Sequence, residues 1–135
     1  MSTDISVRSS SYQVEDRSWL VGTHGVDITP GITLDISKFT KATHYANGYI
    51  PSGTLLGKVT SGGLYGPYDD AASDGRQVAA GILFSSVRAI DNNGTTLTKV
   101  GGARFIHGAV NTAKLPTNSG IDANGKADLP LIVWL

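Results

Sequence analysis

The chain has 135 residues, which favours a single domain that can bury a core without covalent cross-links. It contains no cysteine, so disulfides and thiolate metal sites are excluded, and its 11 Lys and Arg balance its 11 Asp and Glu, which argues against binding a polyanion. The 17 glycines, well above the usual share of about 7%, favour turn-rich β structure over long helices. No apolar run approaches the ~20 residues of a membrane span, and the N-terminus lacks a secretory pattern, so we expect no membrane partner.

Residues 1–16 are predicted to form an extended N-terminal arm, and residues 17–135 a single β-rich domain. The arm is mostly Ser, Thr and charged residues, so it cannot bury much apolar area alone. Its apolar residues alternate with polar ones in two short runs, which suits a strand that needs the sheet of a partner. The positions that would contact such a partner are Ile5, Val7, Tyr12 and Val14.

The residues that follow the arm are predicted to begin the folded domain. Trp19–Val21 is a candidate for the first anchored strand, and Trp19 is expected to lie in the core. His24–Thr29 and Gly31–Ile36 are predicted strands on either side of the turn at Pro30. In the second of these, apolar and polar residues alternate, which predicts one buried and one solvated face. Lys38–Gly48 is predicted to be a polar connection.

The central part of the chain contains two apolar segments separated by a polar, Gly-rich crossing. Ile50–Thr60 is predicted to be the first core β unit, with its glycines allowing tight bends or bulges. Ser61–Gly63 is a predicted turn, and Tyr65–Gly75 is predicted to be a loop because proline, glycine and carboxylates interrupt it. Gln77–Ala89 is predicted to be a strand, since β-branched and aromatic residues surround its internal glycine.

The last third of the chain continues the pattern of short strands and turns. Asp91–Thr95 is predicted to be a hairpin turn of type I′, because Asn-Gly accepts positive φ. Thr96–Val100 and Ala103–Val110 are predicted strands separated by a Gly-Gly pair, and Asn111–Leu115 a short helical turn. Thr117–Ala127 is predicted to be a loop, and Leu131–Leu135 a final buried strand that includes a core Trp134. The predicted fold is therefore a small β-barrel or β-sandwich with at most one or two short helices.

No arrangement of residues in the sequence indicates catalysis or a bound cofactor. The histidines, His24, His44 and His107, have no ligand spacing, so structural roles are favoured over a metal site. Asp69, Asp70 and Asp74 crowd one loop, where a hard-cation site is conceivable, but turn formation and solubility explain them better. The Asn-Gly pair within residues 122–128 is interpreted as a turn. With neither a Gly-x-Ser-x-Gly elbow nor a phosphate-binding loop, we predict no enzymatic activity and no cofactor.

The crossing between the two central apolar segments is the candidate interaction loop of the folded domain. Aromatic residues on a loop are enriched at protein interfaces. The other interpretation is that they cover one end of the barrel, and the sequence does not separate the two. The residues concerned are Leu64, Tyr65, Pro67 and Tyr68.

Three segments carry a resemblance to the lambda D-type head decoration proteins of tailed phages. They are Pro51–Gly57, Tyr65–Asp69 and Ala80–Leu83, with a weaker match from Asn111–Pro116 towards Leu131–Leu135. The resemblance implies a compact domain that forms homotrimers at three-fold positions on the outer surface of the expanded capsid. It implies the major capsid protein as partner, an arm that becomes ordered on the capsid, and stabilisation of the head against DNA pressure. The protein would be made in the host cytoplasm and would not contact nucleic acid.

The sequence departs from that family in two places, and two competing functions are weighed against the resemblance. The region before Tyr49 is long, and Thr117–Ala127 is distinctive, so the boundary of the arm is not fixed by the resemblance. The first competing function is a carbohydrate- or peptide-binding β module of a virion or cell-surface protein, which the aromatic crossing and the Asp cluster motivate. The second, a small hydrolase, is disfavoured because the sequence lacks a recognisable pair of activated groups.

Overall fold

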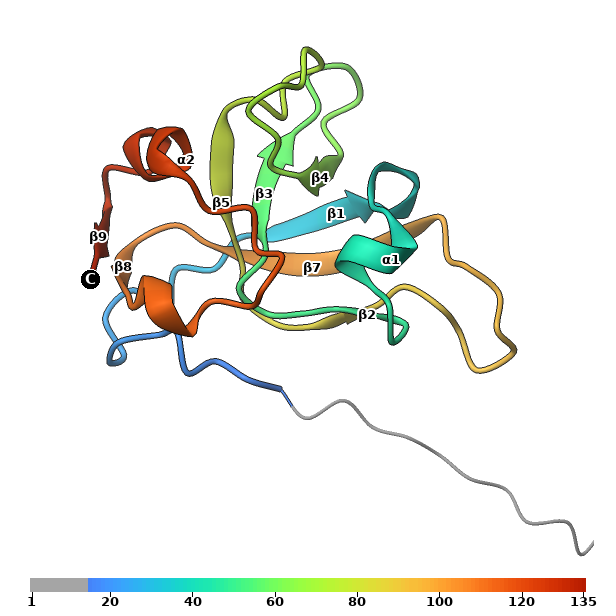
Figure 1. The fold of residues 1–135 in the computed structure, drawn as a ribbon, viewed down its shortest axis with the longest axis horizontal. Coiled ribbons are helices and arrows are strands. Elements are labelled where there is room, and N and C mark those ends of the chain that lie inside the picture. Colours follow the sequence, from blue (N-terminus) through green and yellow to red (C-terminus); the bar gives the residue numbers. More distant parts are fainter. Residues whose placement is uncertain (1–14) are drawn as a thin grey trace, which may run out of the picture.

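The computed structural model describes residues 15–135, which form a β-barrel with short flanking elements (Figure 1). Within these residues the barrel has five strands, in the spatial order β1 (Gly31–Asp35), β4 (Tyr65–Pro67), β3 (Leu55–Lys58), β5 (Ala79–Leu83) and β7 (Lys99–Phe105). The two α-helices among the described residues are short, α1 (Lys41–His44) and α2 (Ala123–Asp128). The predicted mainly β fold is confirmed. The predicted contact residues Ile5, Val7, Tyr12 and Val14 lie outside the described residues.

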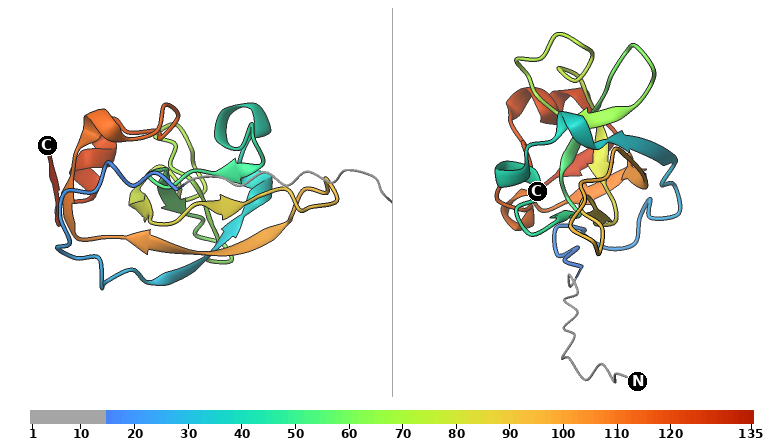
Figure 2. Two further views of the ribbon diagram at one scale, coloured as in Figure 1. Left: turned by 90° about the horizontal axis from the view of Figure 1, so that it is seen from below. Right: turned by 90° about the vertical axis from the view of Figure 1, so that its right-hand side faces the viewer.

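Smaller elements flank the barrel at both ends. Strand β2 (Tyr49–Ile50) pairs antiparallel with β6 (Val87–Arg88), and β8 (Gly108–Val110) pairs in parallel with β9 (Ile132–Trp134). The 3₁₀ turns η1 (Ile36–Lys38) and η2 (Thr112–Lys114) follow β1 and β8. The hairpin that follows β6 projects at one end of the molecule, while β9 and α2 lie at the opposite end (Figure 2). None of the helices in residues 15–135 is long and apolar enough to cross a membrane.

The barrel is unevenly paired around its circumference. Strand β1 pairs antiparallel with β7 over its five residues, but it meets β4 in parallel at a single position, Leu34 opposite Tyr65. Strand β3 pairs with β4 on one side and β5 on the other, with an irregularity between Leu56 and Gly57. The β1–β4 seam is therefore the least paired part of the barrel wall.

Both faces of the barrel wall are buried. Neighbouring residues on a strand point to opposite faces, so they belong to different core clusters. One core cluster contains Leu34, Leu56 and Leu83, and the other contains Leu55 and Ile82, which immediately precede Leu56 and Leu83. Complete burial of such side chains contributes about 1.5–3 kcal/mol each. The second cluster also holds Phe105 and Trp19, whose rings meet edge to face with centroids 5.4 Å apart. The indole of Trp19 donates a hydrogen bond to Ser52, which confirms its predicted core position.

The first predicted strands are only partly correct. Gly31–Asp35 is a strand, with Leu34 buried as the alternation predicts. Trp19–Val21 is not a strand, since Leu20 makes one isolated bridge with Val110. His24–Thr29 forms turns. Gly25 has φ +82° and passes against the backbone of His107, where a Cβ would clash, so both features require glycine there.

Two predicted connections contain regular structure. Lys38–Gly48 includes α1 and buries Phe39 and Tyr45, so it contributes to the core. Tyr65–Pro67 is strand β4 and does not belong to a loop. The predicted strand Gln77–Ala89 is divided into β5 and β6 by a bend at residues 84–86.

Two predictions that rest on glycines in the C-terminal half, a break at Gly101-Gly102 and a type I′ turn at Asp91–Thr95, are wrong. Gly101 and Gly102 lie inside β7 opposite β1 and do not divide it, because neither has a positive φ. The turn at Asp91–Thr95 exists, but it is not type I′, since Gly94 is its only residue with positive φ. The Asp91 carboxylate accepts hydrogen bonds from the N–H groups of Asn93 and Thr95, which stabilises another turn geometry.

The predicted loop Thr117–Ala127 contains most of α2. Asp122 caps this helix by accepting a hydrogen bond from the Gly125 N–H at 2.7 Å. The Asn-Gly pair is therefore helical, and Gly125 lies close to Leu55 and Tyr68, where a larger residue would crowd the core. The short helical turn predicted at Asn111–Leu115 is confirmed as the 3₁₀ turn η2.

Candidate functional site

An exposed row of apolar side chains lies on the C-terminal strand β9. Leu131, Val133 and Leu135 are 61%, 59% and 62% exposed, and we call these three residues the β9 surface. They occupy alternate positions, so they share one face, while Ile132 between them is buried. The prediction that Leu131–Leu135 is buried throughout is therefore wrong. These are three of the six exposed large apolar residues in residues 15–135.

The β9 surface lies at the edge of a small layer of extended chain. Strand β8 pairs with β9 on one side, and on the other its Ala109 carbonyl accepts a hydrogen bond from the Val21 N–H at 3.1 Å. Strand β9 has no second strand partner within residues 15–135. An edge strand of this kind presents backbone groups that another chain can pair with, and a row of exposed apolar side chains marks an interaction site.

The first described residues of the chain are tied to the barrel beside this layer. Glu15 accepts hydrogen bonds from the Ser86 N–H and from Arg17, whose guanidinium lies 4.3 Å from the centre of the Phe84 ring. The chain then continues into Trp19–Val21, which runs along β8. The N-terminal segment is therefore joined to the layer that carries the β9 surface.

The predicted interaction loop is largely buried within its own domain. Tyr65 and Tyr68 are both 6% exposed, Pro67 is buried, and Leu64 is half-buried. The Tyr68 hydroxyl donates a hydrogen bond to Asp122 at 3.0 Å, and burial raises the pKa of Tyr68 above its usual value. These aromatic side chains therefore stabilise the barrel, which weakens the basis of the carbohydrate-binding interpretation. That the segment contacts a partner stays a prediction.

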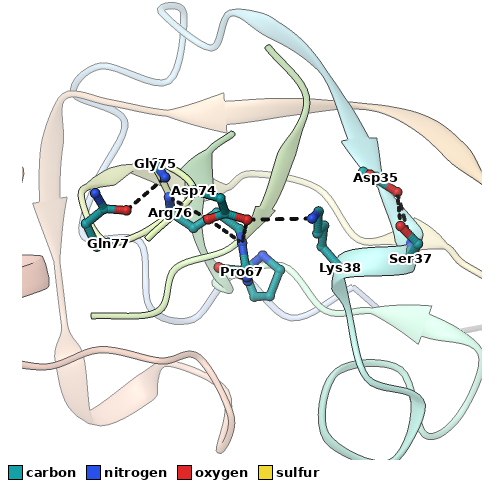
Figure 3. A network of polar contacts seen from close by, with 8 residues as sticks. All are labelled: Asp35, Ser37, Lys38, Pro67, Asp74, Gly75, Arg76 and Gln77. Atoms are coloured by element: carbon teal, nitrogen blue, oxygen red, sulfur yellow. Dashed lines mark hydrogen bonds and ion pairs between the residues drawn. The ribbon is translucent and has the colours of Figure 1, made fainter. Parts of the chain in front are cut away.

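The polar crossing after β4 is held to the barrel by Asp74 and Arg76 (Figure 3). Asp74 accepts from Arg76 Nε at 3.0 Å and lies 3.6 Å from Lys38 Nζ. The hydrogen bond from Arg76 holds the pKa of Asp74 below its usual value. Arg76 passes over the paired glycines Gly57 and Gly66, where a Cβ on either would clash with it.

The three clustered carboxylates of this crossing bind different partners. Asp69 accepts a hydrogen bond from the Ala71 N–H, and Asp70 accepts one from the Asn124 amide at 2.8 Å. Asp74 is paired with Arg76, as described above. Among residues 15–135 no group of three or more His, Cys, Asp or Glu side chains is arranged to hold a metal ion. Asp69 therefore stabilises a turn, while Asp70 and Asp74 join the crossing to α2 and to the residues that follow β1.

Two of the histidines that are distant in sequence lie together. The rings of His24 and His107 have centroids 4.7 Å apart, which joins the turns before β1 to the start of β8. His44 is separate, and its Nδ1 accepts a hydrogen bond from the Thr40 N–H at 2.8 Å. Burial lowers the pKa of His44. These contacts are those of structural histidines.

Comparison with protein families matches residues 37–129 to the bacteriophage lambda head decoration protein D family. Because the match spans more than half of the chain, this protein belongs to that family of capsid decoration proteins, which are structural proteins and not enzymes. Membership implies binding to the phage capsid and a place on the capsid surface of the virion. A search of curated proteins gives no match.

The matched region contains the three main segments of the resemblance but excludes two structural elements. Strand β1 and strand β9 lie outside residues 37–129, as does the tail segment Leu131–Leu135 of the weaker resemblance. Sequence reasoning missed the β9 surface because Leu-Ile-Val-Trp-Leu contains no polar residue, a pattern typical of a strand buried on both faces. Only the structure, which leaves one face of β9 uncovered, reveals its exposure.

Proposed function

We propose that this protein binds the outside of the expanded phage head as a trimer at three-fold positions and stabilises the head against internal DNA pressure. The observation that carries this proposal is the β9 surface, an exposed apolar edge on a domain of a capsid decoration family. The partner is the major capsid protein. The function requires a folded domain with surfaces that bind the shell, and it involves no chemical step.

The β9 surface is proposed to be one part of the folded domain that contacts the shell. Burying Leu131, Val133 and Leu135 against apolar residues of the shell would remove their side chains from water, which is favourable by about 25 cal/mol per Å² of apolar area. The free edge of β9 could at the same time pair with an extended segment of the shell. A zero net charge suits a protein that covers protein and not DNA.

The predicted arm provides the second contact in this proposal. Its alternating apolar residues, Ile5 and Val7 in one run and Tyr12 and Val14 in the other, suit strand addition to a capsid sheet. In a trimer, three arms and three β9 surfaces would engage one site, and each weak contact would raise the effective concentration of the next. Because expansion would create the site, binding would follow maturation.

Co-sedimentation with purified shells tests the proposed function. The full chain is mixed with expanded and with unexpanded shells of a phage that carries this protein, and the pelleted fraction is measured. We expect binding to expanded shells only. Absence of binding to both kinds of shell would contradict the decoration function, and equal binding to both would contradict its dependence on maturation.

A further inference from the structure

A groove lies at the β1–β4 seam, on the least paired part of the barrel wall. It has a volume of about 710 Å³ and is bordered by the first residues of β1, the turn between β3 and β4, and the middle of β7. Glycines form much of its lining, so few side chains fill it. The residues used in the argument are Gly31, Thr33, Lys58, Tyr65, Gly101 and Arg104.

The seam exposes the backbone of β1 to this groove. Arg104 donates its N–H to the Pro30 carbonyl, and Ile36 donates to Thr98, which directs the even-numbered residues of β1 towards β7. Gly31 therefore directs its backbone groups into the open part of the seam, while those of Thr33 and Asp35 flank the parallel bridge between Leu34 and Tyr65. Before Leu34, β1 has no strand partner on this side within residues 15–135.

Two cations border the groove without an acidic partner. Among the described residues, neither Lys58 nor Arg104 has a carboxylate within ion-pair distance. Arg104 Nη1 donates to the Ala80 carbonyl at 2.9 Å, and its guanidinium lies 5.4 Å from the centre of the Tyr65 ring. Its Nε is buried and has no hydrogen-bond partner in the described part of the chain. No carboxylate of the described residues pairs with the charges of Lys58 and Arg104, so an incoming carboxylate would be stabilised beside them.

We infer that this groove binds an extended, acidic peptide segment, which adds as a strand to β1 and places a carboxylate between Lys58 and Arg104. This inference rests on the proposed function in one respect, since it assigns the segment to the shell protein. The acidic side chains of residues 15–135 favour that source over the folded domain of a second copy. Within residues 15–135 every Asp and Glu except Asp27 already accepts a hydrogen bond or ion pair inside its own chain.

The site is tested first without any shell. The probe is the peptide acetyl-Thr-Val-Glu-Val-Thr-amide, which is titrated into the isotopically labelled full chain while backbone amide resonances are recorded. We expect shifts centred on the groove residues Gly31, Thr33 and Gly101, with about tenfold weaker binding of the matching peptide that has Gln in place of Glu. Absence of shifts, shifts centred elsewhere, or equal binding of the two peptides would overturn the site.

The partner is tested by shell binding of charge variants. Lys58→Glu is compared with Lys99→Glu, which makes the same charge change at an exposed β7 residue outside the groove lining. We expect Lys58→Glu to weaken binding to expanded shells by roughly tenfold to a hundredfold, and Lys99→Glu to have little effect. Equal binding of the two variants would overturn the assignment to the shell.

Other outcomes separate this inference from the proposed function. If wild-type protein fails to bind shells, the proposed function fails and the shell is excluded as partner, while the peptide titration still decides the site. If Lys58→Glu changes the oligomeric state of the free protein, the groove is an interface between copies, and the assignment to the shell is overturned.

The variant Gly101→Tyr is a steric test of the groove. A side chain can be added at Gly101 without strain, because a Cβ there meets no atom within 4 Å and the φ of Gly101 is not positive. This variant is expected to abolish peptide binding and to retain cooperative unfolding.

Discussion

At the scale of single residues, polar side chains that suggest an interaction site in the sequence are used to join segments of the fold. Tyr68 connects the end of β4 to the start of α2 through Asp122, whose carboxylate also caps that helix. Asp74 and Arg76 hold the crossing of residues 69–78 against β3 and β4. The residue types of this region are those of a binding loop, but their partners lie within the chain.

Replacing Tyr68 with Phe tests this structural role. The change removes the hydroxyl that donates to Asp122 but retains the buried ring, so the free energy of unfolding should fall by about 0.5–1.5 kcal/mol. The measurement is denaturant unfolding of Tyr68→Phe, Asp122→Ala and the double variant. We expect the two changes to be non-additive, because they share one hydrogen bond. Full additivity, or an unchanged stability of Tyr68→Phe, would contradict the assigned contact.

At the scale of elements, sequence patterns predict a strand correctly where apolar and polar residues alternate. They fail where glycines or tertiary contacts determine the secondary structure. Gly31–Asp35 is found as predicted because its apolar residues alternate. Gly101 and Gly102 instead suggest a break, but pairing with β1 keeps them extended within β7. Helix α2 is hidden by its Asn-Gly pair, since the cap at Asp122 and the packing of Gly125 are tertiary effects.

Tertiary structure also explains why the β9 surface and the groove at the seam could not be predicted from the sequence. Leu131–Leu135 is apolar at all five positions, and whether a strand is central or at an edge depends on the order of the strands in space. The groove at the seam depends on one missing stretch of pairing between β1 and β4. Neither property has a local signal in the sequence.

The β9 surface is tested by placing a charge on it. Val133→Asp should leave stability within about 0.5 kcal/mol of wild type, because the side chain is exposed, and should weaken binding to expanded shells at least about tenfold. The matched control is Val78→Asp, which changes a similarly exposed valine away from β9. Unfolding curves and shell co-sedimentation provide the two readouts. Equal losses of shell binding in both variants would contradict a specific role for β9.

At the scale of the whole molecule, the domain combines a tightly packed barrel with contact surfaces at its edges. The barrel buries both faces of its central strands, whereas β9 and the β1–β4 seam leave backbone and apolar side chains accessible. This division suits a protein that must remain rigid while it is attached to a lattice. The trimer and the arm contacts stay predictions that follow from membership of the decoration family.

Removing Ser2–Val14 tests the separate role of the predicted arm. The folded core of residues 15–135 has its own packed clusters, so we expect cooperative unfolding to be retained in the truncated protein. Attachment to expanded shells should weaken, since one of the proposed contacts is lost. Thermal unfolding and co-sedimentation measure the two effects. Loss of the cooperative transition would show that the arm belongs to the core.

Electron cryomicroscopy of expanded shells saturated with the full chain tests the central claim most directly. The account predicts density for a trimer of the barrel domain on the outer surface at each three-fold position, with β9 and the N-terminal arm in contact with the major capsid protein. Shells that show no added density, or density away from the three-fold positions, would contradict it.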